Sequence, residues 1–231
     1  MQQLPLGVRL RDRASFESFL TGGNQAIVSE LRAIASYRRF GCHWLCGAPG
    51  SGKSHLLQAT FAAAAAEGTA AFLPLRELHA LGADSLSGWQ SARVLCLDDV
   101  DIVLGDRQWE RALFAVHRDA EERGAALLLS AGAAPAQCAF ALPDLGSRCR
   151  AAAVHGLSLL ADEEQREALR LRAKIRGLEL PEETAVYLQR HQPRDMDSLC
   201  RLLDKLDIEA LREQRRLTIP FVREVLGITA A

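Results

Sequence analysis

Long apolar runs alternate with amphipathic segments along the first two thirds of the chain. The apolar runs predict strands within residues 42–47, 70–75, 92–100 and 125–135. Each is apolar over most of its length rather than at every second position, which is typical of a parallel sheet whose two faces are both covered. The intervening segments predict helices, so the pattern indicates an α/β fold in which helices cover a parallel sheet.

The amphipathic segments show which helix faces turn toward the sheet. Trp109, Leu113 and Val116 recur at a spacing of three to four residues, with charged residues between them. Ile27, Leu31 and the residues around them repeat the same pattern near the start of the chain. A stripe of this kind predicts a helix with one buried face.

The pattern changes near residue 160. Glycine becomes scarce, and charged amphipathic segments continue to residue 227. Pro181 precedes one predicted helix, while Gly177 and Gly227 follow two others, as expected of helix boundaries. We therefore divide the chain into a flexible peptide at 1–12, an α/β nucleotide-binding domain at 13–159 and a small helical domain at 160–231.

Composition and charge exclude several classes of protein. Of the 231 residues, 48% are hydrophobic and 25% charged, and the formal net charge is −1. This balance is ordinary for a globular protein and gives no basic field for tight, autonomous DNA binding. No apolar run is long enough to span a bilayer, and no signal peptide is recognisable. The six cysteines then indicate reduced thiols, and we expect a cytoplasmic protein with no membrane partner.

The strongest chemical signal is the stretch from Gly47 to Ser54. It reads GAPGSGKS and matches the phosphate-binding pattern G-x-x-x-x-G-K-[ST], placed between a predicted strand and a predicted helix. The glycines allow backbone N–H groups to face phosphate oxygens, Lys53 supplies positive charge, and the hydroxyl of Ser54 is a ligand for Mg²⁺. The sequence therefore predicts a nucleoside triphosphate site.

Two acids end the third apolar run and complete this prediction. Asp98 is expected to hold the magnesium shell, and Asp99 to polarise an attacking water. A polar strand end without catalytic meaning is the alternative. Many ATPases use the longer glutamate at the second position, so the residues alone leave open how well Asp99 would activate water.

Three further polar residues are candidates for contact with a nucleotide. Ser130 ends the fourth predicted strand, where either a phosphate or solvent could face it. Arg148 is expected just past the last sheet strand, from where it could reach a neighbouring subunit's nucleotide; Arg150 competes for that role, and a plain surface arginine is the alternative. Arg194 opens a helix of the second domain and could reach the nucleotide from that side.

These motifs, in this order, resemble the AAA+ ATPases of the bacterial DnaA initiator group. The stretch FESFLTGGNQAIV resembles the group's nucleotide-pocket segment, and the stretch from Arg194 to Leu226 is similar to the end of the Hda family of DnaA-related regulators. The resemblance implies an AAA+ fold with a helical lid. It also implies that Arg148 acts in trans as an arginine finger on ATP bound to DnaA. Arg194 would then be the lid's nucleotide sensor. Where the group often has aspartate two residues after Ser130, this chain has Gly132.

The same resemblance gives a meaning to the opening peptide, which a signal sequence does not explain. Hda-like proteins dock on the replication sliding clamp through a short peptide of this form, and Gln3, Leu4, Pro5 and Leu6 match it. An extended peptide of this kind can insert two leucines into an apolar groove, and the proline limits the entropy lost on docking. Gly7 departs from the pattern at the last position.

The resemblance thus implies a regulator that sits on the clamp, activates the ATPase of DnaA and prevents re-initiation, rather than a turnover ATPase. Its expected partners are DnaA, the sliding clamp and, through the clamp, DNA near the nucleoid; a homodimer or higher oligomer is also expected. An autonomous AAA+ ATPase of the helicase-loader type is the first alternative, and a small-molecule P-loop kinase is the second.

The candidate residues fall into three groups. The catalytic candidates are Arg148 and Asp99. The expected ligands of ADP or ATP with Mg²⁺ are Gly47, Pro49, Gly50, Ser51, Gly52, Lys53, Ser54, His55, Asp98, Ser130 and Arg194, with Ser54 and Asp98 on the metal side. The clamp-binding candidates are Gln3, Leu4, Pro5 and Leu6.

Overall fold

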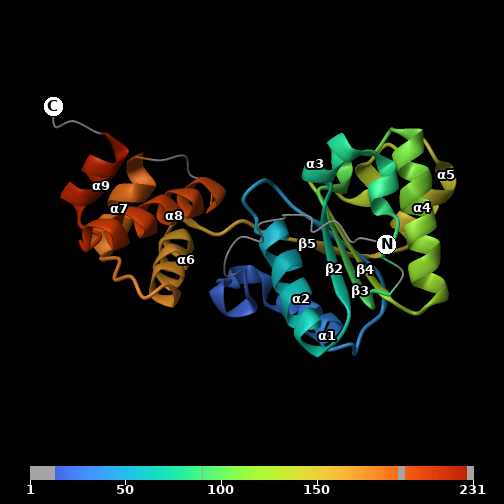
Figure 1. The fold of residues 1–231 in the computed structure, drawn as a ribbon, viewed down its shortest axis with the longest axis horizontal. Helices are drawn as coiled ribbons and strands as arrows, with labels where there is room; N and C mark the ends of the chain where they lie inside the picture. Colours follow the sequence, from blue (N-terminus) through green and yellow to red (C-terminus); the bar gives the residue numbers. More distant parts are fainter. Residues whose placement is uncertain (1–13, 90, 192–195, 228–231) are drawn as a thin grey trace.

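A five-stranded parallel sheet forms the centre of the larger domain (Figure 1). The structure is a computed structural model and describes residues 14–89, 91–191 and 196–227. The strands are β1 (Gly41–Cys46), β2 (Ala70–Pro74), β3 (Val94–Asp98), β4 (Ala126–Ala131) and β5 (Ala153–Gly156), in the spatial order β2-β3-β4-β1-β5. All four strand pairs are parallel. The α/β fold predicted from the apolar runs is confirmed.

Strand β5 is the one sheet element that the apolar pattern did not predict. It has four residues at an edge of the sheet, and three of them are exposed. Without a buried apolar run it leaves little trace in the sequence. We expected Arg148 to follow the last strand of the sheet. It lies instead between β4 and β5, so that prediction was wrong.

Helices cover both faces of the sheet. On one side lie α1 (Gln25–Ala35) and α2 (Lys53–Glu67); on the other lie α3 (Leu75–Leu78), α4 (Arg107–Glu122) and α5 (Pro143–Arg150). Successive residues of β3 serve opposite faces, since Leu95 and Leu97 pack with the α4 side while Val94 and Cys96 pack with the α2 side. This double burial explains why the strand is apolar throughout.

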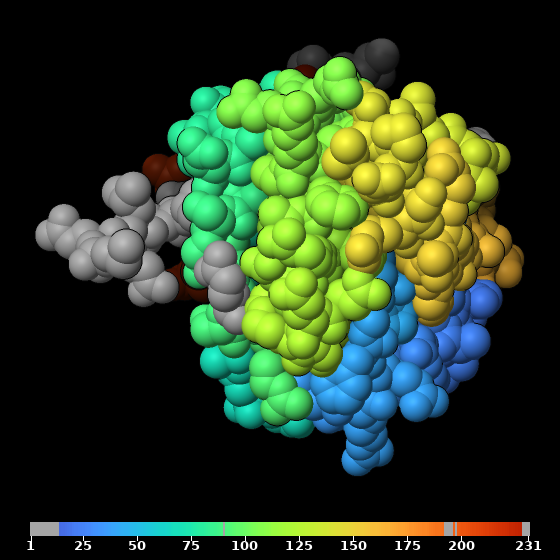
Figure 2. All heavy atoms as spheres, turned by 90° about the vertical axis from the view of Figure 1, so that its right-hand side faces the viewer, coloured from blue at the N-terminus to red at the C-terminus, as the bar shows by residue number. Residues whose placement is uncertain are grey.

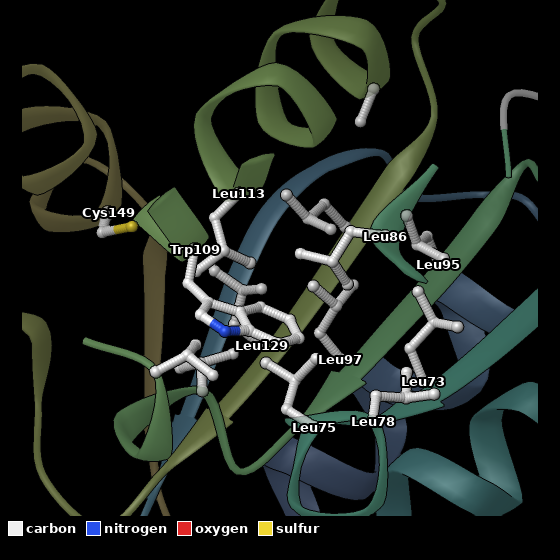
Figure 3. Close-up of a cluster of buried hydrophobic side chains, with 14 of the residues drawn as sticks. Leu73, Leu75, Leu78, Leu86, Leu95, Leu97, Trp109, Leu113, Leu129 and Cys149 are labelled. Carbon is white, nitrogen blue, oxygen red and sulfur yellow. The ribbon is translucent and has the colours of Figure 1, made fainter. Parts of the chain in front are cut away.

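The core beneath α4 is built around the large side chain of Trp109. Leu97 and Leu129 of neighbouring strands point toward Trp109 and Leu113 of α4, with Cys149 of α5 nearby (Figure 3). The predicted stripe on this helix therefore faces the sheet. Burying side chains of this size contributes about 1.5–3 kcal/mol each.

A buried carboxylate fixes the segment that leads into α5. Glu110 is fully buried on α4, and it accepts hydrogen bonds from the backbone N–H groups of Gly105 (2.7 Å), Ala141 (3.0 Å) and Leu142 (2.6 Å). Burial of a carboxylate is tolerated only with such partners. Glu110 thereby ties the start of α5, the helix that carries Arg148, to the body of the domain.

The second domain consists of helices around their own core. These are α6 (Asp162–Ile175), α7 (Glu182–His191), α8 (Met196–Glu213) and α9 (Ile219–Leu226). Their buried leucines, together with Phe221, form a cluster separate from the two clusters of the sheet. This lid lies at one end of the molecule's long axis, and α4 and α5 lie at the other (Figure 1). Among the described residues, no helix combines the length and the apolar character needed to cross a membrane.

Candidate nucleotide-binding site

The glycine-rich turn between β1 and α2 leaves no room for side chains at two of its glycines. A Cβ atom on Gly47 would lie 2.7 Å from the Oγ of Ser51 and 2.9 Å from the carbonyl oxygen of Leu157. Gly52 has φ of +91° and caps the start of α2, and a Cβ there would lie 2.6 Å from the ring of Phe19. Glycine adopts this left-handed conformation without strain. The turn therefore exposes backbone N–H groups at a helix start, an arrangement that suits phosphate.

The segment before α1 closes the turn from one side. Asn24 is buried, its amide donates to the carbonyl oxygen of Ser158 (3.1 Å), and its carbonyl accepts from the N–H of Ser158 (2.9 Å). These two hydrogen bonds, together with the packing of the Phe19 ring against Gly52, hold the N-terminal segment and the linker to the lid beside the phosphate-binding turn. The stretch that resembles the DnaA group's pocket segment thus lies against residues 47–54.

The polar groups of the turn are suited to binding an anion. The Nζ of Lys53 donates to the carbonyl oxygens of Gly47 (2.8 Å) and Ala48 (3.2 Å), which keeps its charge over the turn. The hydroxyl of Ser51 is buried and has no hydrogen-bond partner among the described residues. An ammonium group, an unpaired hydroxyl and a helix start are the donors that bound phosphates use.

Asp98 lies buried at the end of β3, and two serine side chains hydrogen-bond its carboxylate. The hydroxyl of Ser130 donates to its Oδ1 (2.5 Å), and Ser54 also bonds its carboxylate. Burial raises the pKa of Asp98, and the bonds from Ser130 and Ser54 oppose that rise. The two oxygens expected around Mg²⁺, from Ser54 and Asp98, are thus brought together.

Asp99 takes an unusual backbone conformation directly after Asp98. Its φ is +59°, which costs about 1–3 kcal/mol for a residue other than glycine. Its N–H donates to the Oγ of Ser130 (2.9 Å), and its Oδ2 accepts from the Nε of Arg76 on α3 (3.0 Å). Ser130 therefore bridges the two aspartates, and the carboxylate expected to polarise water is paired with an arginine.

Gly132, where the resemblance leads us to expect aspartate, is itself bonded by an aspartate. The Oδ2 of Asp101 accepts from the N–H of Gly132 (2.9 Å). A carboxylate from the segment after β3 therefore lies where one after β4 was expected.

The structure does not bring Arg148 to this site. Its guanidinium pairs with Glu121 of α4 and lies 5.2 Å from the ring centre of Phe114. It borders a cavity together with Gly41, at the opposite end of β1 from the phosphate-binding turn. The two ends of this six-residue strand are about 17 Å apart at roughly 3.3 Å per residue. One arginine side chain does not bridge that distance.

A contact between the lid and α2 was not foreseen from the sequence. The Nη2 of Arg172 on α6 bonds the Nδ1 of His55 (2.5 Å), and its Nη1 bonds the Sγ of Cys200 on α8 (2.7 Å). The Nε2 of His55 bonds the carbonyl oxygen of Ser15 (2.9 Å). Because a carbonyl only accepts, Nε2 carries the proton and Nδ1 accepts from Arg172. Nothing in the spacing of charged residues along α6 singles out Arg172.

Several predicted site residues lie outside the described part of the chain. These are Arg194, in the segment before α8, and the clamp-binding candidates Gln3, Leu4, Pro5 and Leu6.

Comparison with solved structures identifies the fold. Domain III of the replication initiation protein DnaA from Thermotoga maritima aligns over 93% of this chain and 95% of its own, with a TM-score of 0.75 and 19% identity. AMPPCP-bound DnaA from Aquifex aeolicus aligns over 87% of this chain and 68% of its own, with a TM-score of 0.62 and 21% identity. The Thermotoga maritima RuvB Holliday junction branch migration motor aligns over 94% and 72%, with a TM-score of 0.60 and 15% identity. The parallel sheet with its phosphate-binding turn and helical lid is therefore an AAA+ P-loop fold.

The sequence of the helical lid allows a more specific comparison than the fold alone. Residues 162–226, which contain all four lid helices, match the family model of the Hda lid domain. The chain thus combines a fold like that of DnaA domain III with a C-terminal segment that matches the Hda lid domain.

Proposed function

We propose that this protein is a regulator of replication initiation that stimulates hydrolysis of ATP bound to DnaA by presenting Arg148 in trans. The match to the Hda lid domain and the likeness to DnaA domain III support this class of function. Hydrolysis would leave DnaA inactive, so that re-initiation is prevented.

The observation that carries the proposal is the position of Arg148. It lies on α5, at the end of the molecule away from the lid (Figure 1), while the phosphate-binding turn of the same chain lies at the opposite end of β1. Two AAA+ subunits stacked head to tail would place this arginine of one against the nucleotide of the next. A guanidinium group beside the terminal phosphate accelerates hydrolysis by about 10³–10⁵ in related systems.

The chain's own nucleotide serves a different purpose in this proposal. Lys53 and the turn around it would hold ADP or ATP, and Ser54 and Asp98 would hold Mg²⁺ on the phosphates. When bound, the metal neutralises part of the phosphate charge. The pairing of Asp99 with Arg76 leaves that carboxylate poorly placed to activate water. The bound nucleotide, ADP in the form we propose, then supports the shape of the protein rather than fuelling turnover.

Attachment to DNA is proposed to be indirect. Gln3, Leu4, Pro5 and Leu6 would dock on the sliding clamp and thereby bring the protein to the nucleoid. The same head-to-tail contact would let copies of this chain associate with each other, as in a homodimer or larger oligomer.

The experiment compares Arg148→Ala with Arg150→Ala in an assay of ATP bound to DnaA, with clamp and DNA present. Arg150 is the matched control because it lies on the same helix and stacks on a different ring, that of Phe140. We expect the first variant to lose the stimulation and the second to keep it. Equal stimulation by Arg148→Ala and the unchanged protein would remove the proposed role.

A separate measurement addresses the clamp. The double variant Gln3→Ala, Leu4→Ala is expected to lose affinity for the isolated clamp while its binding of ADP is unchanged. Unaltered clamp affinity would separate this protein from the clamp, whatever the role of Arg148.

A further inference from the structure

One side of α4 faces α5. Glu110, Phe114 and Glu121 are spaced by four and seven residues, so they lie on one stripe of the helix. Glu110 binds the start of α5, while Phe114 and Glu121 both contact Arg148 in the last turn of α5. The two helices, green and yellow, lie side by side on the face shown in Figure 2. A single stripe of α4 therefore contacts both ends of the helix that carries Arg148.

The stripe fixes where the carboxylate of Glu121 lies relative to Arg148. The carboxylate of Glu110 accepts from the N–H groups of Ala141 (3.0 Å) and Leu142 (2.6 Å), which ties the start of α5 to α4. Since α5 is a short helix of eight residues, its last turn is then held against the end of α4. The ion pair between Arg148 and Glu121 follows from this packing of the two helices.

The guanidinium group of Arg148 is held from two sides. Its Nη1 bonds the Oε2 of Glu121, and its central carbon lies 5.2 Å from the ring centre of Phe114. Arg150, two residues further on, also lies over a ring, that of Phe140, but within the described part of the chain it forms no ion pair. Of these two arginines on α5, only Arg148 has a carboxylate partner.

That carboxylate competes with phosphate for the same cation. Carboxylate and phosphate oxygens bind a guanidinium group in the same way, so a phosphate that takes Arg148 must displace Glu121. The pair lies at the surface and contributes little free energy, so the terminal phosphate of a triphosphate can displace it. A diphosphate lacks that group, and the arginine then keeps its carboxylate.

We propose that Glu121 is a positioning residue that restrains Arg148 in the free protein, and that the terminal phosphate of the partner's ATP releases it. The inference rests on the proposed function, because that function brings the partner's nucleotide to Arg148. The carboxylate holds the arginine at one place on the contact surface and takes it back once the terminal phosphate has been hydrolysed. Engagement of Arg148 thus depends on a triphosphate in the partner.

The test removes the charge of Glu121 and keeps its size. Glu122→Gln is the matched control, because Glu122 is the next residue of the same helix, is 66% exposed against 63% for Glu121, and pairs with Arg118 instead. The measurement is hydrolysis of ATP bound to DnaA, with clamp and DNA present, at a concentration of this protein below the half-maximal one. For Glu121→Gln we expect stimulation to rise about two- to fivefold, and for Glu122→Gln to stay unchanged. A folding defect would not produce such a gain.

A second measurement separates the restraint from a general effect of charge. Glu121→Gln is expected to bind AMPPCP-bound DnaA about two- to fivefold more tightly than the unchanged protein does, and ADP-bound DnaA no more tightly. Removal of a negative charge from a contact surface would by itself change both affinities alike. The double variant Glu121→Gln, Arg148→Ala should stimulate no better than Arg148→Ala, because the gain acts through the arginine.

The outcomes separate the two proposals. If Arg148→Ala abolishes stimulation while Glu121→Gln stimulates no better than the unchanged protein, the restraint is overturned and the proposed function stands. If Glu121→Gln and Glu122→Gln give the same gain, or if both nucleotide forms of DnaA are bound more tightly, the gain comes from surface charge and the restraint is again overturned. If Arg148→Ala stimulates normally, the proposed function fails and the restraint fails with it.

Discussion

The two ends of the parallel sheet, at the carboxyl and the amino ends of its strands, differ in how their polar groups are bonded. At the carboxyl end, Asp98 is bonded by Ser130 and Ser54, and Ser130 also accepts from the N–H of Asp99. At the amino end, Arg148 has a single ion pair at the surface and both nitrogens of His117 are unpaired among the described residues. The carboxyl end is organised by several hydrogen bonds within the chain, whereas the amino end holds Arg148 by one ion pair at the surface.

This difference indicates which functions one chain can perform alone. A binding site whose side chains already hold each other in place loses little entropy when a ligand arrives. An arginine held at the surface by one ion pair can exchange that partner for a group of another molecule, because surface ion pairs contribute little free energy. We therefore interpret the carboxyl end as a site for the chain's own nucleotide and the amino end as a site for another molecule.

The largest expected effect concerns the carboxyl end. Lys53→Ala removes the ammonium group from the phosphate-binding turn, and hydrogen bonds to charged groups contribute about 1.5–3 kcal/mol. We expect ADP to bind about 10- to 100-fold more weakly, as measured by calorimetry. Lys174→Ala, on the exposed side of α6, is the control and should bind ADP normally. Equal affinity for both variants would contradict the assignment of this turn as the nucleotide site.

A smaller effect is expected from breaking the bridge between the two aspartates. Ser130→Ala leaves the buried carboxylate of Asp98 and the N–H of Asp99 without this partner, which should cost about 1–3 kcal/mol of unfolding free energy. For a chain of this size that corresponds to a fall in Tm of about 2–4 °C per kcal/mol. Ser29→Ala, at an exposed position of α1, serves as the reference. Denaturation curves that coincide for the two variants would show that the carboxyl end is not organised as described.

The smallest expected effect is a dependence of stability on pH at the β1–β5 edge. The Nδ1 of His43 and the Nε2 of His155 are 3.2 Å apart, and the Nε2 of His43 bonds the carbonyl oxygen of Phe40. Burial lowers the pKa of both imidazoles, and the neighbouring Glu30 opposes this. The unfolded chain therefore binds more protons than the folded one as the pH falls below about 6.5, and stability decreases with acidification.

The size of this effect is limited because His155 is only half-buried and partly screened by solvent. We expect about 1 kcal/mol or less to be lost between pH 7.5 and 5.5, and the loss should shrink in the double variant His43→Gln, His155→Gln. Urea unfolding at the two pH values, for both proteins, measures it. An identical pH dependence in both would assign the loss to other groups.

The sequence predicted the parts of the site that follow from strand order. Asp98 and Ser130 end two apolar runs, and parallel strands bring such ends to one edge of the sheet. The pairs Arg76–Asp99, Arg148–Glu121 and Arg172–His55 were not predicted. Each joins elements far apart along the chain, and long charged side chains choose partners only once those elements have packed. Strand β5 was missed for a related reason, since an exposed edge strand needs no apolar run.

The most direct test of the central claim is a structure of this protein in complex with DnaA bound to AMPPCP. We predict that the guanidinium group of Arg148 leaves Glu121 and lies within hydrogen-bond distance, about 3 Å, of a terminal phosphate oxygen of the analogue. A complex in which Arg148 stays paired with Glu121 and faces solvent, away from the nucleotide of DnaA, would contradict the account.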